Sequence, residues 1–227
     1  MPTGQQDPAS TETAIADPGS APPLRGAGVP AVGNEPAPGD DIRELIRSDL
    51  YRYAGDCSRS SLIRHLLFNR SFKYSFWLRL CRSPSFPVRT LARIMHRHLS
   101  NSYGIQIPPS TRIGPGLFIG HHMGLVINHT TTIGWNCNLG QFTTIGSNHE
   151  RAARIGNNVY IGPGVCVVED VVIGDNATIG AGAVVVKDVP ENSTVAGNPA
   201  KVVSTRHPGR YVCNRWPMAG RETSRPG

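Results

Sequence analysis

Two adjacent histidines, His121 and His122, lie in the glycine-flanked stretch IGHHMGLV. The unperturbed pKa of histidine is close to neutrality, so an imidazole here can remove a proton from a hydroxyl group at physiological pH. An isolated histidine is more often structural than catalytic, so the interpretation depends on the pattern around the pair. The histidines lack the spacing with acidic residues that is typical of a metal site, and no metal is expected.

The pair interrupts a repeat of six residues, which begins before it at Ile107, Ile113 and Ile119. An aliphatic side chain recurs at every sixth position on both sides of one ten-residue gap, at Ile127, Ile133, Leu139 and Ile145, and then at Ile155, Ile161, Val167, Ile173, Ile179 and Val185. A period of six fits neither an amphipathic helix nor a plain alternating strand. It is typical of hexapeptide repeats, whose short strands wind into a parallel β-helix, here of about five coils.

Each hexad is expected to form one flat face of a prism, with three hexads to a coil. The aliphatic residue points inward and stacks on its counterparts about 4.8 Å away in neighbouring coils. The glycine that usually follows it allows unusual backbone angles at the corner. The alternative is a chance run of glycine and aliphatic residues in an ordinary β domain, and ten aliphatic residues in phase argue against it.

The repeat is broken at two places, and a break in a solenoid is where functional residues are usually found. The first break separates Ile119 from Ile127 and contains the histidine pair. The second separates Ile145 from Ile155 and contains His149. The additional residues are expected to leave the prism as loops.

Four segments are predicted along the 227 residues. Residues 1–40 contain eight prolines and no aromatic residue, which is typical of a disordered tail. Residues 41–100 have the apolar spacing of helices and form a short α-helical cap. Residues 101–204 form the β-helix, and residues 205–227 are expected to be poorly ordered beyond a few residues.

The net charge of +7 is compatible with nucleic acid, an anionic membrane or an anionic ligand as a partner. No zinc-finger spacing or aromatic-basic RNA motif supports nucleic acid, so none is expected. Five widely spaced cysteines are typical of reduced thiols in a cytosolic protein. Without a visible secretory signal or a run of eighteen apolar residues, a cytoplasmic location and no transmembrane helix are expected.

The helical segment is strongly basic. Between residues 40 and 100 there are twelve Arg and Lys against five Asp and Glu, and FKYSFWLRLCRS is aromatic on one side and basic on the other. The simpler interpretation is a helical cap with a solvated basic face. The alternative is contact with anionic lipid at the inner face of the membrane, with Phe72, Phe76 and Trp77 at the interface.

The run from GIQIPPSTRIGPGLFIGH to IGAGAVVVKDVPENSTVAGNPAKVV resembles the left-handed β-helix acyltransferases over roughly residues 70–204. More narrowly it is similar to the serine acetyltransferase branch, which includes acetyltransferases of bacterial surface polysaccharides. The left hand of the coil is implied by this resemblance alone, since parallel crossovers are otherwise almost always right-handed. The resemblance also implies acetyl transfer from acetyl-CoA to a hydroxyl, with His121 at the position of the family's general base and His122 beside the acceptor.

The chain departs from the pattern of serine acetyltransferases at two substrate-engaging positions. Gln106 stands where the family has an aspartate, and Ala152 stands where it has a second histidine. The joint absence of these groups argues against free serine as the acceptor. Gln106 remains a candidate acceptor contact, and His149 in the shortened loop is a partial substitute for the missing histidine.

The resemblance places coenzyme A in a groove between adjacent subunits, along small residues of the coil that let the pantetheine arm approach the backbone. These residues are Gly146, Pro163, Gly164, Ala181 and Gly182, with Lys187 and Lys201 as candidate partners of the phosphates. Gln141 and Trp135 are expected near the same edge, in contact with acceptor or thioester. His121 would face coenzyme A held largely by a neighbouring subunit, near Ala181 and Gly182.

Together with the resemblance, these observations predict a homotrimeric, cytoplasmic O-acetyltransferase that acts on a sugar hydroxyl of a surface polysaccharide or its precursor, with the inner face of the membrane as an alternative location. The first alternative is serine acetylation for cysteine biosynthesis. The second is a non-catalytic β-helix scaffold or a carbonic-anhydrase-like relative, which would need three clustered histidine ligands that the sequence does not show. The helical segment is shorter than the one that joins serine acetyltransferase trimers into hexamers, so a plain trimer is expected.

Overall fold

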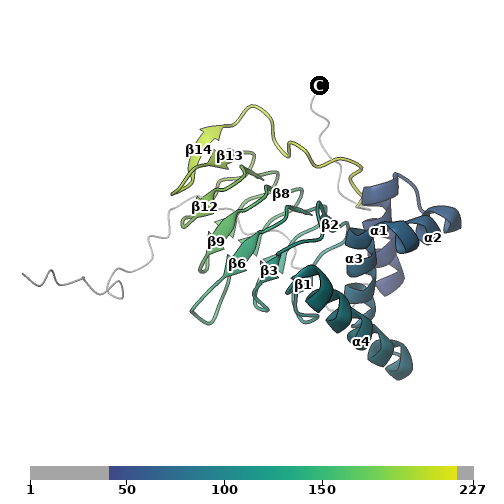
Figure 1. Ribbon diagram of the computed structural model, residues 1–227. Helices are drawn as coiled ribbons and strands as arrows, with labels where there is room; N and C mark the ends of the chain where they lie inside the picture. The colour runs from purple at the N-terminus through teal and green to yellow at the C-terminus, as the bar shows by residue number, and fades with distance from the viewer. Residues whose placement is uncertain (1–40, 219–227) are drawn as a thin grey trace, which may run out of the picture.

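The computed structural model describes residues 41–218 (Figure 1). The predicted tail of residues 1–40 and the last nine residues lie outside that range. Four helices come first and cover one end of a β-solenoid. They are α1 (Ile42–Ala54), α2 (Arg59–Phe68), α3 (Arg70–Leu80) and α4 (Phe86–Tyr103).

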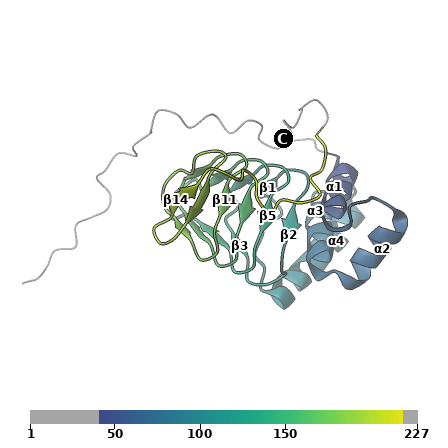
Figure 2. The ribbon, with the colours of Figure 1, turned by 90° about the horizontal axis from the view of Figure 1, so that it is seen from above.

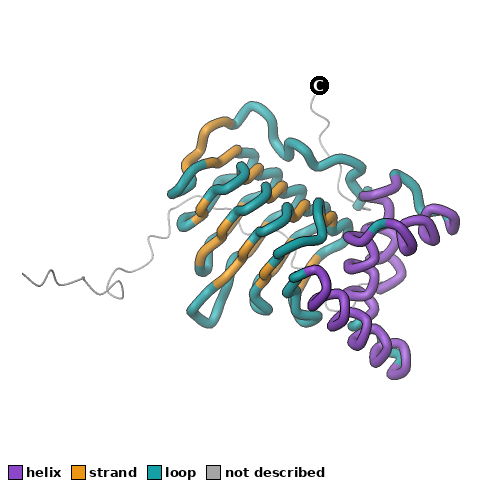
Figure 3. Tube along the Cα trace, in the orientation of Figure 1, coloured by secondary structure: helices purple, strands orange, loops and turns teal. Residues whose placement is uncertain are grey.

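The solenoid is a three-sided prism, and the strands of successive coils pair in parallel within each face. Figure 3 shows these short strands separated by corners. Face A contains β3 (Val126–Ile127), β6 (Thr144–Gly146), β9 (Cys166–Val168) and β12 (Val184–Val185). Face B contains β1 (Arg112–Ile113), β4 (Thr132–Ile133), β7 (Arg154–Ile155) and β10 (Val172–Ile173). Face C contains β2 (Phe118–Ile119), β5 (Asn138–Leu139), β8 (Tyr160–Ile161), β11 (Thr178–Ile179) and β13 (Thr194–Ala196), with β14 (Lys201–Ser204) added antiparallel.

The chain passes from face B to C to A in each coil, which makes four complete turns rather than the expected five. The predicted inward stacking is confirmed, because Ile133 pairs in register with Ile155 across the ten-residue gap, and both are buried. The additional residues of the two breaks therefore leave the coil as loops without shifting its register. The corners define three edges, which we name by the faces they join: B–C, C–A and A–B.

The glycine after each aliphatic residue has a different role from the one expected. Gly162 does not have a positive φ, but a Cβ on it would lie 2.8 Å from the backbone nitrogen of Ala181 in the next coil. Left-handed backbone angles occur two residues further on, as at Asn158 with φ 54° and Asn176 with φ 57°. These asparagines stack, since the Asn158 side-chain amide donates to Asn176 Oδ1 at 3.1 Å. Close contact between coils therefore explains the glycine that follows each aliphatic residue. The asparagine two residues further on adopts the left-handed backbone angle that the corner needs.

The alternative in which the aromatic side chains of α3 meet lipid does not fit the structure. Phe72 is fully buried in the cap, and Phe76 and Trp77 are half-buried. Their rings pack inside the cap, where the T-shaped pair of Tyr53 and Phe72 has centroids 5.8 Å apart. The large exposed apolar side chains of the cap lie on α2 and α4 instead.

Residues 205–218 were expected to be largely unordered, but they return along the solenoid to α1 (Figure 1). The Trp216 backbone amide donates to Asn136 Oδ1 at 2.8 Å, and the Asn138 side-chain Nδ2 donates to the Tyr211 carbonyl at 3.0 Å. The Arg52 Nε donates to the Cys213 carbonyl at 3.0 Å. This segment ties the coil to α1. All five cysteines are free.

A buried ion pair joins the cap to the first coil. Arg79 and Asp49 are 3% and 0% exposed, and two guanidinium nitrogens reach the two carboxylate oxygens at 2.9 and 3.0 Å. The remaining Arg79 donors bond to the carbonyls of Ile113 and Gly114. Asp49 also accepts from the Leu117 amide at 2.8 Å. The cap is therefore held to the first coil by a buried ion pair whose two charged groups are hydrogen-bonded.

Replacing Arg79 with methionine should lower the free energy of unfolding by about 3–5 kcal/mol, because Asp49 would stay buried without its partner. Urea unfolding followed by circular dichroism measures the loss. Arg82→Met, at an exposed position two residues after the end of the same helix, is the matched control and should change stability by less than about 0.5 kcal/mol. Equal effects of the two variants would contradict a locking role for the buried pair.

Candidate active site

The histidine pair lies at the C–A edge, in the loop between β2 and β3. The Met123 amide donates to the His121 carbonyl at 2.9 Å, and Gly124 follows with a φ of 67°. Gly124 packs so closely on the ring of Phe142, in the next coil, that a Cβ on it would collide with that ring. The Phe142 amide donates to the Met123 carbonyl at 3.0 Å. The loop is therefore a tight turn supported by the coil beside it.

The two histidines differ in their surroundings. His122 is half-buried and packs edge-on against Tyr103, with ring centroids 4.9 Å apart. Burial is the largest cause of the lowered pKa of His122. The positive charge of Arg70 and the neighbouring His121 lower this pKa further. His121 is exposed to solvent. The His121 imidazole is therefore accessible from solvent, whereas the His122 ring packs against Tyr103.

An open hollow of about 500 Å³ lies beside this turn, lined by Arg70, Ser102, Tyr103, His122 and Met123. Arg70 begins α3, and Tyr103 ends α4, so the cap forms one wall of the hollow. A guanidinium in this position can hold an anionic group of a bound acceptor. The sequence did not single out Arg70 or Tyr103, because no repeat or motif links the cap residues to the turn; the only signal is the position of Tyr103 just before the first coil.

The C–A edge continues past this turn as a row of small residues. The Gly164 amide donates to the Gln141 carbonyl, and the Gly182 amide donates to the Pro163 carbonyl, both at 2.8 Å. Gly164 and Gly182 have φ angles of 68° and 69°, and nothing lies within 4 Å of a Cβ on Gly182. The structure thus brings seven of the predicted residues to one edge: His121, His122, Gln141, Pro163, Gly164, Ala181 and Gly182. The expectation that Ala181 and Gly182 serve a neighbour's His121 changes accordingly, because they share an edge with His121 of their own chain.

A second group of predicted residues lies at the A–B edge, across face A from His121. It contains Gly146, His149 in the loop that follows β6, and Lys187 after β12. The His149 side chain is 78% exposed, and its Nε2 lies 3.7 Å from Glu169 Oε2. A hollow of about 510 Å³ adjoins this loop, with Arg151 and Arg154 in its lining. One chain therefore holds the two groups of candidate residues apart, on opposite edges of one face.

The two positions that depart from serine acetyltransferases lie in different surroundings. Gln106 is exposed and forms a bridge with Val126, so it extends face A by one rung next to the histidine turn. Ala152 is 1% exposed, and its amide donates to Thr130 Oγ1 at 2.9 Å. Gln106 can reach a ligand, whereas Ala152 supports the loop.

Two other predicted residues, Trp135 and Lys201, lie elsewhere on the coil. The expectation that Trp135 lies near Gln141 is wrong, because Trp135 follows β4 on face B and so lies at the B–C edge. Its carbonyl accepts from the Asn158 amide at 2.8 Å within that edge. Lys201 is exposed in β14, opposite Ala196, at the end of the coil.

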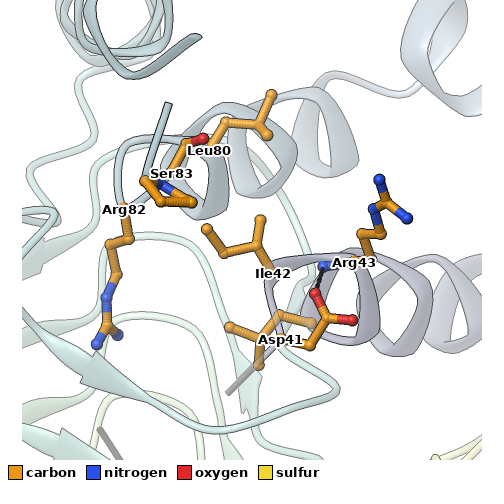
Figure 4. A pocket seen from close by; sticks show the side chains of 8 residues that line it. Asp41, Ile42, Arg43, Leu80, Arg82 and Ser83 are labelled. Atoms are coloured by element: carbon orange, nitrogen blue, oxygen red, sulfur yellow. Dashed lines mark hydrogen bonds between the residues drawn. The ribbon is translucent and has the colours of Figure 1, made fainter. Parts of the chain in front are cut away.

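A further hollow of about 510 Å³ lies between the start of α1 and the end of α3 (Figure 4). Ile42, Leu45, Leu80 and Pro84 contribute to its lining. Its carboxylate, Asp41, accepts from the Arg43 amide at 3.0 Å and caps α1. The residues that line this hollow therefore serve in packing and in capping α1. Among residues 41–218, no three His, Cys, Asp or Glu side chains are grouped so as to hold a metal ion.

Comparison with known proteins agrees with this arrangement. The family described as "Bacterial transferase hexapeptide (six repeats)" matches residues 152–187. A serine acetyltransferase of Staphylococcus aureus is 45% identical over 178 residues, covering 72% of this chain and 76% of its own length. Serine acetyltransferase 1 of Arabidopsis thaliana chloroplasts is 36% identical over 119 residues, which cover 51% of this chain. The match spans 38% of that plant relative and 53% of a Synechococcus elongatus serine acetyltransferase that is 38% identical.

Solved structures give the same result. Soybean serine acetyltransferase complexed with serine superposes with a TM-score of 0.59 and 33% identity, covering 71% of this chain and 69% of that one. Serine acetyltransferase of Brucella abortus in complex with coenzyme A gives a TM-score of 0.58 and 27% identity, covering 71% and 67%.

Proposed function

Since this chain belongs to the left-handed β-helix, hexapeptide-repeat acyltransferases, on their serine acetyltransferase branch, we propose that it transfers an acetyl group from acetyl-CoA to a hydroxyl group. The observation that carries the proposal is the C–A edge. An exposed His121 on a supported turn begins a row of small residues, with Gly164 and Gly182 leaving the backbone open. A base and an unobstructed ledge for a long, thin donor therefore lie on one edge.

The proposed reaction needs few protein groups, because the thioester is already activated. His121 takes the proton of the acceptor hydroxyl as its oxygen attacks the thioester carbonyl carbon. The tetrahedral intermediate then collapses, the carbon–sulfur bond breaks, and the imidazolium returns the proton to the coenzyme A thiolate. No side chain is acylated, so donor and acceptor must be bound together.

Coenzyme A is proposed to lie along the C–A edge, with backbone groups at Pro163, Gly164, Ala181 and Gly182 beside the pantetheine arm. Lys201, at the end of the coil, is available for a phosphate. Gly146 and Lys187 lie at the A–B edge and would contribute from a second subunit. We therefore propose a trimer in which each groove combines a C–A edge with a neighbour's A–B edge.

For the acceptor, the comparisons favour the serine alternative over the sugar hydroxyl expected at first, because the relatives are named serine acetyltransferases. Arg70 supports the same choice, since it lines the hollow beside the histidine turn and would pair with a carboxylate. The second candidate, a sugar hydroxyl, is supported by Gln106 and the buried Ala152, which cannot supply the missing acid and imidazole.

Purified protein is expected to acetylate L-serine with a higher kcat/KM than any sugar in a panel of hexoses and N-acetylhexosamines. Release of free coenzyme A thiol measures each reaction. Gln106→Asp restores a carboxylate at an exposed position and should raise kcat/KM for serine about 10-fold through a charge-assisted hydrogen bond to the ammonium group. A sugar preferred at least about 10-fold, with no gain from Gln106→Asp, would assign the second candidate.

A further inference from the structure

Helix α2 presents three large apolar side chains to solvent. Ile63, Leu67 and Phe68 are 58%, 61% and 81% exposed. Ile63 and Leu67 are four residues apart and form one row on the helix surface. The opposite side of α2 faces α3, where His65 packs against Phe72 with ring centroids 6.0 Å apart. The exposed row is therefore a second apolar side on a helix whose inner side is already packed.

Arginines lie beside this apolar row. Arg59 is one turn before Ile63, Arg64 is one turn before Phe68, and both are exposed. Arg70 follows the end of the helix and is also exposed. Alternation of long cationic and large apolar side chains on one helix surface is typical of segments that lie at the boundary between water and lipid.

The charge of this part of the chain has one sign. The 93 residues from Cys57 to His149 contain ten Arg and Lys and no Asp or Glu. Within that stretch Arg79 is neutralised by the buried Asp49 of α1. Asp56, just before α2, accepts hydrogen bonds from the Ser58 amide and the Ser61 hydroxyl at the start of the helix. The outer surface of α2 is therefore cationic.

Three kinds of partner could cover such a surface, and charge decides between them. A second copy of the chain in a symmetric contact would bring the arginines of two α2 helices together, and like charges repel. Nucleic acid would satisfy the arginines, but its phosphates offer no apolar surface to Leu67 and Phe68. An anionic lipid surface satisfies both groups, because the arginines meet the headgroups while the apolar row enters the boundary of the acyl chains.

We propose that α2 docks the protein on an anionic lipid bilayer through Ile63, Leu67 and Phe68, with Arg59 and Arg64 against the headgroups. Figure 2 shows α2 at the end of the molecule remote from β14, where it is free to meet a plane. None of the helices in residues 41–218 has the length and apolar character needed to span a membrane. Because Arg70, which follows the end of α2, lines the hollow at the histidine turn, docking would bring that turn near the lipid surface.

Sedimentation with sucrose-loaded vesicles tests the proposal on the full chain and needs no enzymatic activity. Vesicles of phosphatidylcholine with phosphatidylglycerol should bind the protein, and vesicles of phosphatidylcholine alone should not. Arg59→Gln with Arg64→Gln should weaken binding about 30-fold, at about 1 kcal/mol for each arginine. Leu67→Ser with Phe68→Ser should weaken it at least about 10-fold, and 1 M NaCl should do the same by screening the arginines.

Matched controls use the other end of the molecule. Val202→Ser with Val203→Ser removes two side chains that are 50% and 62% exposed, and Arg206→Gln with Arg210→Gln removes two exposed charges. Both control variants should bind as the unaltered protein does. Equal losses in the β14 and α2 variants, or no preference for the anionic vesicles, would overturn the proposal. So would a mass in analytical ultracentrifugation that falls by half only in the Leu67→Ser, Phe68→Ser variant, because the row would then be an interface between copies.

Discussion

Replacing His121 with alanine is expected to lower the rate of acetyl transfer by at least about 100-fold, the scale for removal of a general base. Binding of acetyl-CoA, measured by calorimetry, should not change, because the small residues of the C–A edge are untouched. Folding should not change either, since His121 is exposed and its carbonyl keeps its bond to the Met123 amide. Addition of free imidazole should restore part of the rate, which loss of a purely structural side chain would not allow.

His122→Ala is the matched comparison on the neighbouring residue. This change removes the contact with Tyr103, so it should lower stability and raise KM more than it lowers kcat. If instead His122→Ala shows the large loss of kcat and His121→Ala is close to normal, the base is His122 and the assignment at the turn is wrong. If both variants are active, the base lies elsewhere, and His149 is the next candidate.

Most of the coil can be predicted from the sequence, but little of the structure around the coil can. A period of six places every inward residue, so the stacking of Ile133 on Ile155 follows even across the irregular loop. Corner identity was predictable as well, because Trp135 is one hexad before Gln141 and must lie one corner away. The expectation that both lie on one edge is wrong because successive hexads turn successive corners of the three-sided coil.

The remaining differences come from contacts between segments that are distant in sequence. No period relates Trp216 to Asn136, yet two hydrogen bonds between them fix residues 205–218 against the coil. The role of Gly162 is likewise set by Ala181 in the next coil and not by its own φ angle. In the cap, the alternative interpretation placed Phe72 at a lipid interface, but a short helix surrounded by three others has few outward positions. Tertiary packing decides which side of such a helix is buried.

The two edges of face A lead to the second prediction with a large effect. One chain carries His121 and its ledge of small residues at the C–A edge, and Gly146 and the loop of His149 at the A–B edge. In the trimer that we propose, the C–A edge of each chain would meet the A–B edge of the next, which would make three equivalent grooves. Each groove then needs an intact C–A edge from one chain and an intact A–B edge from another. A chain that is defective in one edge can still supply the other.

Mixed trimers of His121→Ala and Gly146→Trp chains should therefore recover activity, although each parent is inactive. Gly146 suits the second change because nothing lies within 4 Å of a Cβ on it, so the indole would project from the edge instead of disturbing the core. Random mixing in equal amounts gives an intact pair of edges in about a quarter of the grooves, so about a quarter of the normal activity is expected. The control pairs His121→Ala with Ala181→Trp. Both of those changes lie on the C–A edge, so these mixtures should stay inactive. Recovery in the control mixture, or an active monomer by light scattering, would contradict the shared groove.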